Sequence, residues 1–249
     1  MDITLAILFG SFIGAVLGFI GAGGAMLSVP ILLYIFHFSP LHATTAALAI
    51  VFLAAGSAVI PKLRKGEVLI RDAFLVWAFG LVTNLGTAIL SKELPNALIT
   101  SGFAIILISA GVSMLRGPVL EKTERKIPMA NLVLISLGIG AITGIFGVGG
   151  GFIMIPILVL GFHTSQVKAA GTSLLIIALN CFTSFMGHQS IWHEVKWSLP
   201  IIMAIAAVLV SIFASHHSNK LPKEIMRKSF AYLLFALAIW TILKTWFLG

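Results

Sequence analysis

The sequence is poor in charged residues. Only 10% of its 249 residues are Asp, Glu, Lys or Arg, whereas a soluble domain has about 25%. The few charges are clustered, and none lies between Asp2 and Lys62 or between Lys126 and Lys168. The mean hydropathy is +1.10 and 59% of the residues are hydrophobic. Because a spanning helix needs about 20 apolar residues, this composition excludes an ordinary soluble protein and predicts an all-α integral membrane protein.

Cysteine is nearly absent, and no secretory signal is recognisable. The single Cys181 cannot form an internal disulfide or a metal cluster. The chain starts MDITLAILFG, without a basic residue ahead of the apolar run. We therefore expect this run to be a first membrane segment rather than a signal peptide.

Motifs for catalysis and for nucleotide binding are also missing. The sequence has no HExxH, no paired carboxylates and no Ser/His/Asp grouping. GAGGAM and GVGGGF are not nucleotide loops, because Met26 and Phe152 stand at the last glycine position of G-x-G-x-x-G. We expect no enzymatic activity, no cofactor and no metal.

The net charge of +8 has a simple explanation in a membrane protein. Its basic residues flank the apolar runs, as the positive-inside rule and contacts with anionic lipids require. We therefore expect the lipid bilayer as a partner and no nucleic acid. The predicted location is the cell inner (plasma) membrane, with several spans. Assembly into a homo-oligomer stays open.

Glycine and proline are plentiful in two stretches that match each other. Residues 18–30 read GFIGAGGAMLSVP and residues 144–156 read GIFGVGGGFIMIP. The match predicts two homologous halves, residues 1–115 and 131–249, joined by the polar linker 116–130. The pairs that coincide after a shift of 126 residues include Gly14 and Gly140, Gly23 and Gly149, Gly24 and Gly150, and Pro30 and Pro156; with one inserted residue, Val68 meets Val195.

Each half shows the same order of apolar segments. We expect about eight full spans and two short segments, each short segment following a glycine cluster and being too short to span comfortably. The expected segments are 3–21, 25–37, 43–61, 72–91 and 95–115 in the first half, and 131–147, 151–162, 169–187, 197–215 and 222–247 in the second.

The basic residues favour opposite orientations for the two halves. The loop after segment 43–61 is rich in Lys and Arg, whereas the equivalent loop HQSIWHEVK has only Lys196, balanced by Glu194. The next loop shows the reverse bias. Because basic residues mark the cytoplasmic side, we expect inverted repeats, which many transporters use. A parallel repeat of four spans per half is the alternative.

The glycine clusters predict two helix breaks. Glycine in a helix interior costs about 1 kcal/mol relative to alanine and proline about 3 kcal/mol. Broken helices survive in a membrane only against protein or a wet cavity, and equivalent breaks in two repeats indicate a binding site at the midplane. The short segment after each cluster offers free N–H groups that favour an anion. For Gly14, Gly18, Gly140 and Gly144, close helix packing is the competing interpretation.

The predicted substrate site consists of backbone N–H groups and neutral polar side chains. The spans carry almost no charge, so an anion has to be held by such groups. For each hydroxyl, a bond to its own helix is the alternative. The candidate residues are Gly23, Gly24, Ala25, Gly149, Gly150, Gly151, Thr44, Thr45, Thr172, Ser173, Asn84 and Asn180.

The duplicated motif G-x-x-G-x-G-G-x-x-x-x-x-P resembles that of the TauE/SafE family of sulfite and organosulfonate exporters, and AGTSLL at 170–175 resembles the family's second block. The first half departs from the pattern, with Ala25 in place of a third glycine and ATTAAL at 43–48. The resemblance implies export of small sulfur-containing anions such as sulfite, sulfoacetate, other organosulfonates or thiosulfate. We expect transport by alternating access, with the substrate bound at the midplane between the two glycine-rich helix breaks. An anion channel or small-solute pore is the alternative.

Overall fold

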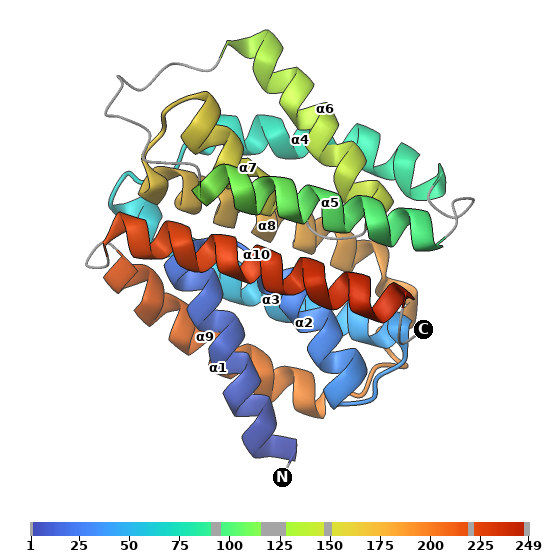
Figure 1. Ribbon diagram of the computed structural model, residues 1–249. Coiled ribbons are helices and arrows are strands. Elements are labelled where there is room, and N and C mark those ends of the chain that lie inside the picture. The colour runs from blue at the N-terminus through green and yellow to red at the C-terminus, as the bar shows by residue number, and fades with distance from the viewer. Residues whose placement is uncertain (1, 91–95, 116–127, 147–150, 219–221, 247–249) are drawn as a thin grey trace. The chain divides into compact units, whose positions relative to one another are not determined.

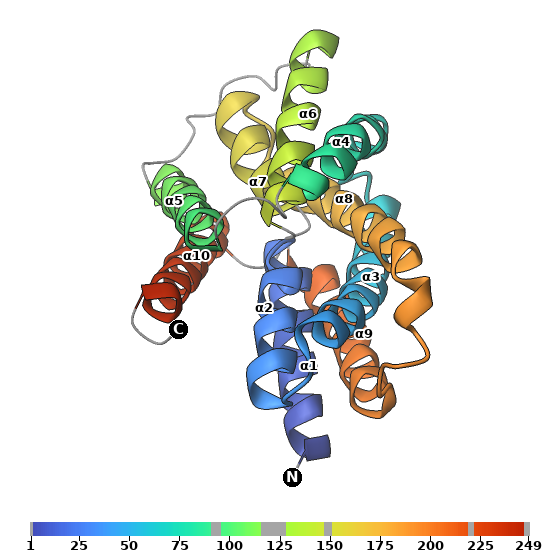
Figure 2. The same cartoon turned by 90° about the vertical axis from the view of Figure 1, so that its right-hand side faces the viewer.

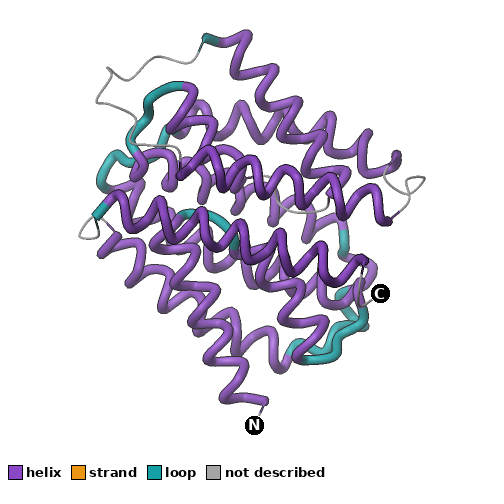
Figure 3. The backbone as a smooth tube through the Cα atoms, viewed as in Figure 1, coloured by secondary structure: helices purple, strands orange, loops and turns teal. Residues whose placement is uncertain are grey.

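A computed structural model gives the architecture of the chain (Figure 1). It describes all residues except 1, 91–95, 116–127, 147–150, 219–221 and 247–249. In this described part every regular element is a helix, and Figure 3 shows helices joined by short loops. The prediction of an all-helical chain is therefore confirmed for these residues.

The helices agree with the predicted segments to within a few residues. The first half contains α1 (Asp2–Ile20), α2 (Gly24–Pro30), the π-helical turn η1 (Ile31–Ile35), α3 (Pro40–Arg64), α4 (Ile70–Leu90) and α5 (Asn96–Leu115). The second contains α6 (Met129–Phe146), α7 (Gly151–Pro156), the π-helical turn η3 (Ile157–Gly161), α8 (Gln166–Gly187), the 3-10 turn η4 (Gln189–Ile191), α9 (Ser198–His217) and α10 (Lys223–Trp246).

Four helices in the described part of the chain are long and apolar enough to cross a membrane. They are α1, α3, α8 and α9. Shorter apolar stretches occur in α5, α6 and α10 and across α2 and η1. The chain is therefore a membrane protein with several spans, while the total of eight spans stays a prediction.

The chain folds into two compact units, and each unit draws on both halves of the sequence. Unit 1 comprises residues 1–73 and 167–220, and unit 2 comprises residues 74–166 and 221–249. Strong packing within a unit therefore joins helices that are far apart along the chain.

In unit 1, α9 packs against both α1 and α3, and α1 and α9 lie side by side in Figure 1. Small residues bring α1 and α9 into backbone contact. A Cβ added at Gly10 would lie 2.5 Å from the carbonyl oxygen of Met203, and one at Gly14 would lie 2.9 Å from Cα of Ala207. The packing interpretation of Gly14 is thus confirmed, since backbones approach this closely only at small residues.

Serines join α9 to α3. Ser211 donates to the carbonyl of Ala54 at 3.0 Å, and Ser215 donates to the carbonyl of Ala58 at 2.6 Å. Such interhelical hydrogen bonds contribute about 0.6–2 kcal/mol each in membrane proteins. They pair polar groups that would otherwise be desolvated in an apolar interface.

In unit 2, α5 packs along α10, as Figures 1 and 2 both show. Helices α4 and α6 cross where the backbones of Gly80 and Gly140 touch. Thr83 and Thr87 of α4 donate across this crossing to the carbonyls of Leu137 and Ala141, at 2.9 and 3.1 Å. Gly140 is therefore also a packing residue.

Each short helix passes through its proline into a π-helical turn. Pro30 ends α2 and η1 follows, while Pro156 ends α7 and η3 follows. Proline lacks the N–H for the i−4 bond and its ring presses on that carbonyl, so a wider turn relieves the clash. Two residues beyond each turn lie His37 and His163, with left-handed φ values of 54° and 56°.

Candidate functional site

The first glycine cluster forms a sharp break between α1 and α2. Gly21 has φ 83° and Gly23 has φ 90°, a conformation that glycine adopts without the steric cost other residues meet. Gly21 still donates to the carbonyl of Leu17 at 2.8 Å and closes α1. Gly23 is then the N-cap of α2. The predicted helix break is therefore present at the first cluster.

The start of α2 is buried and has no side-chain cap. Gly23 and Gly24 are both buried, and glycine at the N-cap supplies no side-chain oxygen to the first turn. The first N–H groups of a helix have no partner within the helix. Gly24 lies against the side chain of Leu17, where an added Cβ would come within 2.5 Å of Cδ1. The hydroxyl of Ser28 donates to the carbonyl of Gly24 at 2.7 Å, within the same helix.

The second cluster is described only in part. Gly149 and Gly150 lie outside the described residues. Gly151 is the first residue of α7, as Gly24 is the first residue of α2. Ala25 lies in the first turn of α2.

The candidate threonines bond to their own helices. The hydroxyls of Thr44, Thr45 and Thr172 donate to carbonyls four residues earlier, at 2.9, 2.8 and 2.8 Å. Each hydroxyl hydrogen is thereby used, so these side chains offer an anion no donor in this rotamer. A bond from each hydroxyl to its own helix, the alternative expected from the sequence, is therefore what the structure shows.

The other polar candidates differ in burial. Ser173 is completely buried in α8 and Asn180, on the same helix, is 8% exposed. Asn84 of α4 is half-buried. Asn180 and Asn84 belong to different compact units.

The block AGTSLL near the start of α8 begins with small side chains, because other backbone segments lie against Ala170 and Gly171. A Cβ added at Gly21 would lie 2.5 Å from Cβ of Ala170, and one at Gly171 would meet the carbonyl oxygen of Glu67. The amide of Leu69 donates to Thr172 Oγ1 at 3.0 Å. The block thus holds the glycine break on one side and the connection from α3 to α4 on the other.

Sequence reasoning missed one functional candidate, Lys62. It placed this residue in a loop, but the structure places it in the last turn of α3 with no exposed surface. Its Nζ donates to Ser218 Oγ at 2.9 Å and lies 3.9 Å from Glu67 Oε2. A charged residue inside a spanning helix is expensive and marks function by default.

A sequence signal for the true end of α3 does exist. Gly66 has φ 68°, its amide donates to the carbonyl of Leu63, and the amide of Glu67 donates to the carbonyl of Lys62. This is the Schellman arrangement, which ends a helix one residue before a left-handed glycine. The GE pair at 66–67 therefore indicates that Lys62 is still helical.

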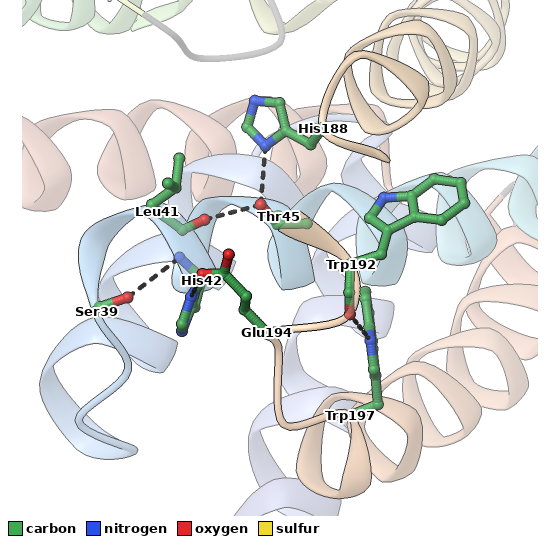
Figure 4. Close-up of polar contacts among 8 residues, drawn as sticks. All are labelled: Ser39, Leu41, His42, Thr45, His188, Trp192, Glu194 and Trp197. Atoms are coloured by element: carbon green, nitrogen blue, oxygen red, sulfur yellow. Dashed lines mark hydrogen bonds and ion pairs between the residues drawn. The ribbon is translucent and has the colours of Figure 1, made fainter. Parts of the chain in front are cut away.

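The opposite end of α3 carries a second polar cluster, shown in Figure 4. His188 Nδ1 lies 2.8 Å from Thr45 Oγ1, and His42 Nε2 lies 3.4 Å from Glu194 Oε2. Since Thr45 donates its only hydrogen to Leu41, His188 acts as the donor in its Nδ1–H tautomer. Burial lowers the pKa of His188 from its ordinary value, because the charged form is poorly solvated there.

Aromatic contacts hold the connection between α8 and α9 in place. The ring of Trp192 stacks on Phe185 with centroids 4.5 Å apart. Trp192 Nε1 donates to the carbonyl of Phe185 at 3.2 Å. Trp197 Nε1 donates to the carbonyl of Trp192 at 2.8 Å, as Figure 4 shows. This bracing fixes the backbone that presents His188 and Glu194 to α3.

Comparison with known proteins places these features in a family of transporters. The family model described as "Sulfite exporter TauE/SafE" matches residues 6–241. A "Probable membrane transporter protein" of Xylella fastidiosa (strain 9a5c) is 27% identical over 95% of this chain and 94% of its own. The "Probable membrane transporter protein YdhB" of Bacillus subtilis (strain 168) is 25% identical over 90% of this chain and 94% of its own. The "Probable membrane transporter protein MJ0441" of Methanocaldococcus jannaschii is 22% identical over 93% and 91%.

Proposed function

The chain belongs to the sulfite exporter TauE/SafE family, and from this premise we propose that it exports small sulfur-containing anions across the inner (plasma) membrane by alternating access. Candidate substrates are sulfite, sulfoacetate, other organosulfonates and thiosulfate. One observation carries the proposal beyond the family name, namely the buried, left-handed glycine break that opens α2 without a side-chain cap.

We assign anion binding to the two glycine breaks. At the first break, Gly23 and Gly24 carry no side chain that covers the N–H groups at the start of α2, where the positive end of the helix dipole adds to the attraction. Gly149 and Gly150 hold the equivalent sequence positions in the other half. The hydroxyl hydrogens of Thr44, Thr45 and Thr172 are used within their own helices, so backbone N–H groups are the proposed donors to the anion.

We propose that the two halves are inverted repeats. Three pairs of features at equivalent positions support a repeat: the turns η1 and η3, the left-handed residues His37 and His163, and the crossings of α1 with α9 and of α6 with α4. The reversed bias of basic residues between equivalent loops supports the inversion. Cysteines introduced at positions 65 and 194 should be labelled from opposite sides of the membrane in intact cells. Labelling from the same side would favour the parallel repeat.

The membrane potential agrees with the outward direction that the family resemblance implies. Moving one negative charge out of a cell with a negative interior is favourable by about 2.3 kcal/mol per 100 mV. The chain therefore needs no sodium or proton gradient to export a monoanion. Uphill movement driven by a pH or sodium gradient alone would contradict this part of the proposal.

Flux into proteoliposomes tests the function. Purified protein is reconstituted, and entry of sulfite, thiosulfate, sulfoacetate and methanesulfonate is compared with entry of chloride and nitrate. We expect saturable flux of at least one sulfur anion and little flux of chloride. Flux that does not saturate and admits all small anions would indicate a channel, and no flux of any sulfur anion would refute the substrate assignment.

A further inference from the structure

Helices α3 and α8 of unit 1 are antiparallel and meet at three levels. Thr45 lies beside His188 at one end, and the side chain of Lys62 lies against Gly171 at the other. Between them, the rings of Phe52 and Phe182 are 5.2 Å apart. At each end of the pair, a basic side chain at the end of one helix reaches the first turns of its neighbour.

One polar cluster, which we call the histidine latch, consists of His42, Thr45, His188 and Glu194. It ties the connection after α8 to the start of α3 through the 2.8 Å and 3.4 Å contacts described above. The side chains of His42 and Glu194 are 29% and 66% exposed, so this pair is solvated, whereas Thr45 beneath it has no exposed surface. Figure 4 shows the latch side chains reaching from both segments into the space between them.

The other cluster, which we call the lysine latch, consists of Lys62, Glu67, Leu69, Gly171, Thr172 and Ser218. It ties the connection after α3 to the start of α8, because Leu69 donates to Thr172 and the carbonyl of Glu67 lies against Gly171. Lys62 extends the latch to α9 through Ser218. The side chain of Glu67 is 16% exposed and that of Lys62 is completely buried.

The two latches occupy equivalent positions of the two halves. A shift of 126 residues carries Thr45 to Gly171 and Lys62 to His188, and the alignment through Val68 and Val195 carries Glu67 to Glu194. Both connections therefore use the same three positions to reach the neighbouring helix. A pseudo-symmetric pair of contacts at opposite ends of two antiparallel spans suits alternating access, because one end can open while the other stays closed.

We propose that the histidine latch and the lysine latch are the two alternating gates of this transporter, with His42, Glu194, Lys62 and Glu67 as positioning residues that control opening. The inference rests on the proposed transport function. By the predicted orientation, the lysine latch closes the cytoplasmic end and the histidine latch closes the external end. Both latches are engaged in this structure.

The chemistry of the two gates differs. A buried lysine and a largely buried glutamate form one latch, whereas two histidines and an exposed glutamate form the other. The contact between His42 and Glu194 is solvated, so changing one of its partners should shift the opening equilibrium of the gate by about two- to fivefold.

Two substitutions of His42 separate charge from shape. Flux of thiosulfate or methanesulfonate is measured at a single pH. His42→Lys places a permanent cation opposite Glu194 and should be slower than His42→Gln, whose neutral amide is a weaker partner. His193→Gln, an exposed neighbour outside the latch, should keep the flux of the parent. Equal flux in His42→Lys and His42→Gln would overturn the gating role.

The decisive experiment measures opening without any substrate. A single cysteine at position 46, which is completely buried one residue beyond Thr45, is introduced together with Cys181→Ala. A water-soluble thiol reagent is applied to the purified protein in detergent. Glu194→Gln should raise the labelling rate about two- to fivefold. The double variant Lys62→Met/Glu67→Gln should lower it, because loosening one alternating gate favours closure of the other.

Matched controls come from the same segments. Arg64→Gln and His193→Gln change exposed residues next to each latch and should leave the labelling rate unchanged. If loosening either latch raises labelling at position 46, the latches are merely structural clasps and the inference fails. No change in either latch variant would refute it as well. Because labelling needs no substrate, these outcomes are separate from a failure of the proposed function, which appears as absent flux in the parent.

Discussion

Replacing Gly14 by alanine should destabilise the contact between α1 and α9. The added Cβ would meet the carbonyl oxygen of Ala207 and lie 2.9 Å from its Cα and 3.0 Å from its carbonyl carbon. All three are backbone atoms, so no side-chain rotation relieves the clash and the helices must separate along their whole contact. Overpacking of this kind costs about 1–3 kcal/mol.

Gly56→Ala is the matched control for this substitution. Gly56 lies in α3 of the same unit, and an added Cβ there meets nothing within 4 Å. Both variants gain about 1 kcal/mol of helix propensity, so the difference between them isolates the clash. We expect Gly14→Ala to be less stable than Gly56→Ala by about 1–3 kcal/mol.

The assay is reversible unfolding of purified protein in detergent micelles, followed by tryptophan fluorescence and by size-exclusion chromatography. Gly140→Ala, where an added Cβ would meet the backbone of Gly80, should behave like Gly14→Ala. The reasoning is refuted if Gly14→Ala is as stable as Gly56→Ala, since the backbone contact would then not limit the approach of the helices.

Three further predictions follow from local geometry. Gly23→Ala should lower the free energy of unfolding by about 1–2 kcal/mol because φ is 90° at this residue. Gly24→Ala should lower it less, because the flexible side chain of Leu17 can move aside. Thermal unfolding distinguishes the two variants. Thr172→Val removes the acceptor of the Leu69 amide and should cost about 1 kcal/mol, and equal stability by the same assay would contradict the bond. Burial lowers the pKa of His188 in the folded state, so on acidification the unfolded state binds the proton first. The free energy of unfolding therefore falls as the pH drops below the pKa of His188 in the unfolded state. His188→Gln should reduce this loss, and an unchanged slope of unfolding free energy against pH would contradict it.

Much of the secondary structure follows from the hydrophobic runs and from the glycine, proline and charged residues that bound them. The absence of charge in long runs fixed the helical segments to within a few residues, because each run is bounded by glycine, proline or charge. The break at Gly21–Gly23 was likewise predictable, since clustered glycines are costly in any continuous helix.

The pairing of helices was not predictable in the same way. Unit 1 joins α3 to α8 and α9, which lie more than a hundred residues further along the chain. A glycine pattern indicates that a helix is approached closely, but it does not name the partner, so Gly14 could not be assigned to Ala207 from the sequence.

The polar contacts show the same limit. The sequence indicated that threonines line the spans, yet the hydrogen of Thr45 is used within its own helix, and only the fold brings His188 to its oxygen. Lys62 was read as a loop residue because the apolar run ends at Pro61. The helix continues for three more residues because the Schellman end at Gly66 and the bond to Ser218 stabilise it there.

Counterflow in proteoliposomes tests the central claim most directly. Vesicles containing the protein are loaded with unlabelled sulfite and diluted into a trace of labelled sulfite, with the membrane potential clamped at zero. A carrier with alternating access predicts transient accumulation of label above its external concentration. The anion site proposed at the second glycine cluster further predicts that Gly150→Ala weakens this accumulation by about tenfold, the effect of losing a charge-assisted hydrogen bond. Label that only equilibrates in the parent, without transient accumulation, would contradict transport by alternating access.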